Sequence, residues 1–235
     1  AHKITILASI AFGIPINFDA VHVEGISNLS QKDITYAEEL GYKIKLLGIA
    51  KSQNTDVEIR VHPTLVPKNR LVANVDGAMN AVLVHGNMVG PTLYYGAGAG
   101  AEPTASAVVA DVIDIARQTK LSQDTLIPSL GFMPDKINEK NILSIENIFS
   151  EYYLRFTMKN QAGLLAKITN IFADHDISIN SMVHKEVQEN NQNPDIFLIT
   201  SKTKEADIDI IISEIELLPE NTEKVVKIRT EELNK

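Results

Sequence analysis

The sequence predicts an α+β protein, in which a mixed sheet with flanking helices is followed by a ferredoxin-like βαββαβ unit. Two observations support this fold class. Residues 43–95 contain several short apolar or alternating runs separated by turn signals, as expected for neighbouring strands of one sheet. After residue 151, strand-like and helix-like segments follow one another in the order β-α-β-β-α-β.

The chain is long enough for two domains. It has 235 residues, of which 44% are hydrophobic, so it can build two hydrophobic cores. Between them the apolar pattern weakens, and prolines and the polar run at residues 135–141 interrupt it. We therefore expect one domain at residues 1–120, a linker at 121–150 and a second domain at 151–235.

Two helices are expected early in the first domain. The first covers residues 3–12 and ends at Gly13, where the apolar pattern stops. The second opens with Ser30 and Asp33, a capping pattern in which each residue satisfies a free N–H of the other, and it stops at Gly41.

Short strands make up the rest of the first domain. They are expected at residues 21–24, 43–51, 57–66, 71–73, 78–85 and 91–95. The strand at 57–66 places valine and isoleucine on one face and Glu58, Arg60 and His62 on the other. We expect this polar face to meet water or a ligand.

A glycine-rich loop follows the last of these strands. Residues 93–104, Leu-Tyr-Tyr-Gly-Ala-Gly-Ala-Gly-Ala-Glu-Pro-Thr, indicate a strand, a loop and the start of a helix. Pro103 suits a first helical turn, because its missing N–H would be unpaired there. The helix should bury an apolar stripe, formed by Val108, Val109, Val112, Ile113 and Ala116.

Two interpretations of the glycine loop remain open. Glycines let a backbone come close to a ligand, and free N–H groups at a helix start attract a phosphate or a polarised carbonyl. Alternatively, they only let the helix pack closely on the sheet. The loop is neither a dinucleotide fingerprint nor a P-loop, because no Gly-x-Gly-x-x-Gly and no Gly-Lys-Ser/Thr are present.

The composition excludes several classes of protein. Without cysteine there is no disulfide or thiolate, and the six histidines form no His-x-x-x-His pair, so no metal site is expected. A net charge of −8 without a basic cluster argues against a nucleic-acid partner. No apolar run has the length of a membrane span and no signal peptide is visible, so we expect no membrane partner and a cytoplasmic location.

The second domain contains a distinctive turn, Asn160-Gln161-Ala162-Gly163-Leu164-Leu165. An acidic or amide residue, two further residues, glycine and then leucine or valine is the signature turn of ACT domains, and the unit at 151–235 resembles this family of amino-acid-sensing regulatory modules. The resemblance implies an effector bound by Asn160, Ala162, Gly163 and Leu164, with Asn180 and Ser181 as the facing wall. Free N–H groups and the helix dipole favour a carboxylate there. The alternative is that Asn160 only caps the helix.

Residues 1–120 resemble the substrate-binding and dimerisation domain of homoserine dehydrogenases. The resemblance rests on Ala1-His2-Lys3 before an apolar helix, on Phe18-Asp19 with Val23-Glu24-Gly25-Ile26, and on residues 96–111. It implies an oxidoreductase that interconverts L-homoserine and L-aspartate 4-semialdehyde with NAD(P), in threonine, methionine and isoleucine biosynthesis. It further implies L-threonine as the effector of the ACT domain, and a homodimer or homotetramer.

The same resemblance gives Lys3 the catalytic role. Lys3 matches the last residue of the family's Asp-x-x-x-Lys signature, whose aspartate would precede Ala1, and it would transfer a proton at the substrate carbonyl or hydroxyl. Because the chain opens inside an apolar helix, we expect an upstream domain that is missing here. The chain alone is therefore expected to be inactive.

The glycine loop would serve the cofactor. By resemblance, Gly100 and Thr104 match positions that contact it near its nicotinamide end, while Gly98 and Ala99 shape the same loop. NAD(P) itself would be held mainly by the missing N-terminal domain. A stand-alone amino-acid-sensing module is the alternative function for the chain.

Overall fold

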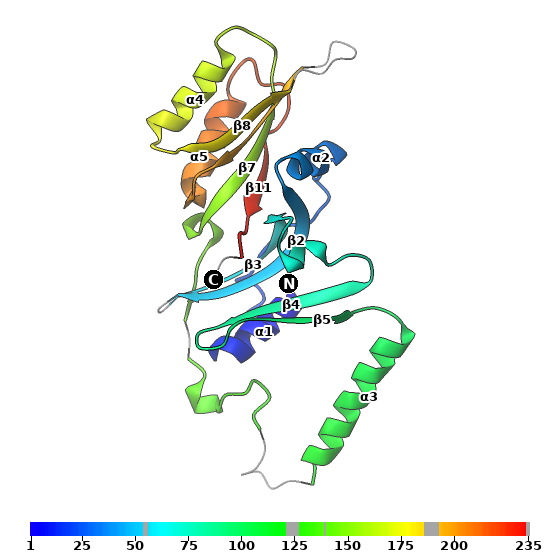
Figure 1. Ribbon diagram of the computed structural model, residues 1–235. Coiled ribbons are helices and arrows are strands. Elements are labelled where there is room, and N and C mark those ends of the chain that lie inside the picture. The colour runs from blue at the N-terminus through cyan, green and yellow to red at the C-terminus, as the bar shows by residue number, and fades with distance from the viewer. Residues whose placement is uncertain (54–55, 121–126, 139, 186–192, 234–235) are drawn as a thin grey trace.

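The computed structural model describes residues 1–53, 56–120, 127–138, 140–185 and 193–233. Within these ranges, a nine-stranded mixed sheet runs through both halves of the chain, and a separate hairpin and a projecting helix lie beside it (Figure 1). The predicted α+β class with a mixed sheet and flanking helices is confirmed.

The elements of the first half are α1 (His2–Phe12), β1 (His22–Val23), α2 (Gln31–Glu39), β2 (Tyr42–Gln53), β3 (Asp56–Pro67), the 3₁₀ turn Leu71–Asn74, β4 (Met79–Gly86), β5 (Gly90–Ala97) and α3 (Ala101–Gln118). Those of the second half are the 3₁₀ turns Pro134–Lys136 and Ile145–Asn147, β6 (Asn141–Ile142), β7 (Phe149–Thr157), α4 (Leu164–Asp174), β8 (Ile179–Lys185), β9 (Asp195–Thr200), β10 (Thr203–Lys204), α5 (Glu205–Glu216) and β11 (Val226–Thr230).

The two early helices form as their end signals predict. Gly13 is left-handed, with φ 64°, and its N–H closes α1 on the carbonyl of Ser9 at 3.0 Å. At the start of α2, Ser30 and Asp33 form the full capping box. Gly41, with φ 86°, follows its last turn.

The strand predicted at residues 71–73 is wrong. These residues belong to the 3₁₀ turn Leu71–Asn74, in which Ala73 donates its N–H to the carbonyl of Arg70 at 3.1 Å. The side-chain amide of Asn74 donates to the carbonyls of Lys68 and Arg70, both at 3.0 Å. These bonds close the chain locally, so it does not extend into a strand.

β3 joins the two halves of the chain. One of its edges pairs along its whole length with β2, antiparallel. Its other edge is shared, in succession, by three short parallel strands: β6, β1 and β11. Since β11 also pairs with β7, the sheet of the second half continues directly into that of the first (Figure 1).

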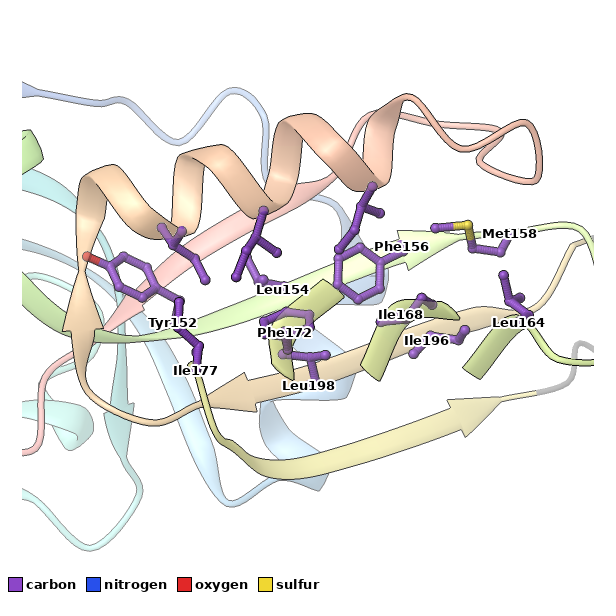
Figure 2. Packing of buried hydrophobic residues seen from close by; sticks show 13 residues of the cluster. Tyr152, Leu154, Phe156, Met158, Leu164, Ile168, Phe172, Ile177, Ile196 and Leu198 are labelled. Atoms are coloured by element: carbon purple, nitrogen blue, oxygen red, sulfur yellow. The ribbon is translucent and has the colours of Figure 1, made fainter. Parts of the chain in front are cut away.

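The second half has the predicted ferredoxin-like arrangement. The elements β7, α4, β8, β9, α5 and β11 follow in chain order, and the strands lie in the order β11-β7-β9-β8. Helices α4 and α5 cover one face of this sheet and enclose a core that includes Leu154, Phe156, Ile168, Phe172 and Leu198 (Figure 2). All five side chains are at most 1% exposed, so this unit has a well-packed core of its own.

Helix α2 of the first half covers the opposite face of that sheet. Tyr36 stacks on Phe197 of β9, with ring centroids 4.4 Å apart. Its hydroxyl donates to Asp195 Oδ2 at 2.9 Å. The sheet of the second half is therefore buried between its own helices and a helix from the first half.

The polar face of β3 does not meet water, contrary to prediction. Glu58, Arg60 and His62 are 8%, 3% and 0% exposed. Arg60 pairs with Glu58 and, at 3.2 Å, with Glu231 near the end of the chain. The face is buried because ion pairs within the chain satisfy its charges.

The buried stripe predicted for α3 is also wrong. Val108, Val109, Val112 and Ile113 are 45–60% exposed, and no residue of α3 is buried. The helix forms, but no described part of the chain covers it, and Figure 1 shows it projecting beyond the β4–β5 hairpin. None of the described helices is both long and apolar enough to cross a membrane.

Candidate functional site

The glycine loop connects β5 with α3. Gly100 has φ 121° and ψ 159°, a conformation that residues with a side chain rarely adopt, and its carbonyl accepts the N–H of Thr104 at 3.2 Å. No side chain caps the start of α3, and residues 98–104 are all exposed. The loop thus presents open backbone at a helix N-terminus, the arrangement that suits an anion or a polarised group.

Gly98 has a packing role as well. A Cβ at this position would overlap the side-chain amide of Asn80 on β4, an exposed side chain that can turn away. The N–H of Gly98 also donates to the carbonyl of Ala78 at 3.1 Å. The loop therefore packs on the hairpin at Gly98, and this packing does not explain the conformation of Gly100.

Lys3 lies on the outer face of α1. It is exposed, as are Ile6, Leu7 and Ile10, which follow it at helical spacing, while Thr5, Ala8 and Ser9 face the core. Nothing in the described part of the chain joins Lys3 to residues 98–104 by a hydrogen bond or an ion pair. The predicted catalytic and cofactor residues therefore lie on open surface.

The ACT signature turn lines a pocket of about 200 Å³. Its walls are Asn160, Gln161, Gly163, Leu164, Leu165, Ala166 and His184. Gly163, with φ 84°, precedes the first residue of α4, and no side chain caps this helix. Asn160 does not cap this helix, contrary to the alternative, so its amide is available to a ligand. The N–H of Leu164 already donates to the carbonyl of Gln161 at 3.2 Å.

Neither Ala162 nor the residues predicted for the facing wall are among those that line this pocket. Asn180 donates its amide to the carbonyl of Thr200 at 3.1 Å and to Glu151 at 3.3 Å, and neither Asn180 nor Ser181 lines the pocket. His184, near the end of β8, lines it instead. The sequence pattern predicts this strand at residues 177–183, two residues short of its end at Lys185, and so leaves out His184.

Comparisons with known proteins match both halves. The family model described as homoserine dehydrogenase matches residues 1–113, and the ACT domain model matches residues 152–220. The homoserine dehydrogenase of Pseudomonas aeruginosa is 48% identical over 234 residues, covering 100% of this chain and 54% of that protein. The homoserine dehydrogenase of Neisseria gonorrhoeae is 48% identical over 233 residues, covering 99% and 53%.

Solved structures show the same likeness. The crystal structure of a homoserine dehydrogenase from Thiobacillus denitrificans matches with a TM-score of 0.90 at 52% identity, covering 99% of this chain and 52% of the other. That of S. aureus homoserine dehydrogenase at pH 6.0 gives 0.67 at 28% identity, covering 97% and 52%. The chain spans about half the length of the relatives it matches.

Proposed function

We propose a function that follows from the family of the chain, because the chain belongs to the homoserine dehydrogenase family and carries an ACT domain. Its function is to supply the substrate-side and regulatory parts of an NAD(P)-dependent oxidoreductase that interconverts L-homoserine and L-aspartate 4-semialdehyde. The observation that carries this proposal is the match of relatives over the whole chain. We retain the domain limits 1–120, 121–150 and 151–235.

Lys3 is the proton-transfer group. A bound reduced nicotinamide would supply the hydride that reduces the aldehyde carbon. The Lys3 ammonium gives a proton to the aldehyde oxygen, so that the alcohol forms and the lysine is left neutral. In the oxidation direction, neutral Lys3 takes the hydroxyl proton. Lys3 lies among exposed apolar residues of α1, so a domain docked there would take it out of water and tune it for this work.

The glycine loop meets the cofactor near its nicotinamide end. Gly100 and Thr104 make the contact, while Gly98 and Ala99 shape the loop. Its open backbone fits such a role, because it leaves N–H groups and space at the start of α3. The exposed apolar face of α3 packs back toward the domain that holds the rest of the cofactor, which accounts for a stripe with no partner among the described residues.

The ACT domain binds L-threonine as a feedback effector. Asn160, Ala162, Gly163 and Leu164 receive its carboxylate and amino group. Asn180 and Ser181 do not line the pocket of one chain, so they would form the second wall only where two ACT domains pair in a homodimer or homotetramer. The uncapped start of α4 at the pocket supports this role.

The test uses the full-length product of the source gene, with reduction of NAD⁺ or NADP⁺ by L-homoserine followed by absorbance. Lys3→Met should lower kcat by about 100-fold or more, because a positioned proton-transfer group contributes at least that much. The matched control is Lys136→Met, since Lys136 is also exposed and pairs only with its neighbour Asp135. Unchanged kcat in Lys3→Met would overturn the role of Lys3. No turnover by the folded wild type would contradict the dehydrogenase and favour the alternative function, a stand-alone amino-acid-sensing module. The 235-residue chain alone should not turn over.

A further inference from the structure

Arg155 of β7 forms a buried ion pair with Asp33 at the start of α2. Its Nε donates to Oδ1 at 2.7 Å and its Nη2 to Oδ2 at 3.3 Å. The two side chains are 6% and 0% exposed. Burial alone would raise the pKa of Asp33, but hydrogen bonds from Arg155 and Ser30 hold it below the ordinary value. The carboxylate is therefore ionised at neutral pH, and the pair is a fixed link between the two halves of the chain.

Arg229 of β11 forms a second buried link. Its Nη1 and Nη2 donate to the two carboxylate oxygens of Glu24 at 3.0 and 2.8 Å, and its Nε donates to Glu205 at 2.7 Å. The Arg229 side chain is 2% exposed. It thus joins Glu24, which follows β1 in the first half, to the first residue of α5 in the ACT domain.

The two carboxylates bracket one segment, residues 24–33. The arginines hold this segment from opposite faces of the ACT sheet. Arg155 and Tyr153 lie on the face that α2 covers, since the Tyr153 hydroxyl also donates to Asp33. Arg229 lies on the helix face beside Glu205, because its register partner on β7 is Tyr152, whose hydroxyl donates to Glu205. Neither end of the segment can shift without breaking a bidentate pair.

One end of this arrangement is connected to the proposed effector pocket, and the other to the start of α1, which carries Lys3. Arg155 lies on the strand that runs into the pocket loop, five residues before Asn160. At the other end, the loop before Glu24 carries Phe18, whose ring packs on His2 with centroids 4.6 Å apart, next to Lys3. A path made partly of side-chain contacts and partly of short backbone segments therefore runs from the effector pocket to the start of α1.

We infer that Arg155 and Arg229 are positioning residues that couple occupation of the ACT pocket loop to segment 24–33 of the substrate domain, and through it to the start of α1. The inference rests on the proposed effector site. A buried arginine–carboxylate pair either keeps its geometry or loses its hydrogen bonds altogether. Movement of β7 or β11 therefore also moves segment 24–33 as long as the pairs are intact.

The test is hydrogen–deuterium exchange of the whole chain, with L-threonine as the probe. In the wild type, L-threonine should slow exchange in the pocket loop, residues 158–165, and also in segment 24–33. In Arg155→Met and Arg229→Met the loop should keep its protection while segment 24–33 loses its response. Arg155→Lys, which keeps the charge without the planar fork, should restore part of it.

A control separates coupling from general damage. Lys227→Met removes a partner of Glu205 and Asp209 within the ACT domain and should leave the response of segment 24–33 intact. Unchanged exchange in β9 shows that each variant is folded. A response of segment 24–33 that survives in the double arginine variant would overturn the coupling, and so would a protected loop without any response of segment 24–33 in the wild type.

A second perturbation needs no ligand. Gly163→Val forces a branched residue into a left-handed conformation and so strains the backbone, while no described residue lies within 4 Å of the added Cβ. This strain should change exchange in segment 24–33, and Arg155→Met should abolish the change. If L-threonine fails to protect the loop, the proposed effector site is overturned. A change of exchange in segment 24–33 of Gly163→Val that depends on Arg155 would still support the coupling. No such change would overturn the coupling.

Discussion

The guanidinium of Arg60 donates from Nε to Nε2 of His62 at 3.0 Å, while Nδ1 of His62 lies 3.0 Å from the carbonyl of Pro63. An imidazole that accepts at Nε2 and donates at Nδ1 is neutral. Burial, together with the charge of Arg229, lowers the pKa of His62 to about 3. A neutral histidine is thus built into the polar face of β3, where the two halves of the chain meet.

This histidine should make the fold sensitive to acid. The unfolded chain protonates His62 near its ordinary value of 6.5, whereas the folded chain resists down to about 3, so its contribution to stability is complete above pH 6.5 and is lost as pH falls. Between these values the free energy of unfolding should fall by about 1.4 kcal/mol per pH unit from this group. Urea unfolding of wild type and His62→Gln at several pH values measures the difference. Parallel pH profiles would contradict it, and exposed His85→Gln is the control.

The core of the ACT domain should respond strongly to loss of volume. Leu154 is 0% exposed within the core shared by the sheet, α4 and α5. Leu154→Ala should lower the free energy of unfolding by about 2–5 kcal/mol, because it removes buried methylenes and leaves a cavity. Leu217→Ala is the matched control, since Leu217 is 83% exposed and its loss should cost less than about 0.5 kcal/mol. Urea unfolding compares the two, and equal losses would be inconsistent with this core.

Substitution of Gly100 should be more destabilising than substitution of the nearby Gly96. Alanine at φ 121° is strained, so Gly100→Ala should destabilise the start of α3 by about 1–3 kcal/mol. Gly96→Ala should be mild, because nothing lies within 4 Å of an added Cβ there. Faster hydrogen exchange over residues 101–108 in the Gly100 variant alone is the expected result. Similar exchange in both variants would mean that the conformation of Gly100 does not hold this helix start.

Local signals were sufficient for the helices. The capping box of Ser30 and Asp33 and the left-handed Gly13 are decided by residues within one turn, so sequence reasoning found α1 and α2. The order of the ferredoxin-like unit followed for the same reason, because each of its elements has its own apolar period. The predicted residues Asn160, Gly163 and Leu164 do line one pocket.

Contacts between residues that are far apart in the sequence could not be predicted from it. Arg60 is buried by Glu231, a partner 171 residues away, and no spacing in the sequence indicates that pairing. The stripe on α3 has the pattern of a buried helix, but burial depends on a covering surface, and the described chain supplies none. His184 reached the pocket because β8 extends beyond its predicted end.

Initial rates of NAD⁺ or NADP⁺ reduction by L-homoserine, with and without L-threonine, test the proposal that the ACT domain controls a homoserine dehydrogenase. Full-length wild type should reduce the cofactor and be inhibited by L-threonine, while Asn160→Leu should keep the uninhibited rate and lose the inhibition. A folded full-length protein without homoserine-dependent reduction of the cofactor would contradict the proposed activity. Inhibition that is unchanged in Asn160→Leu would contradict the proposed effector site.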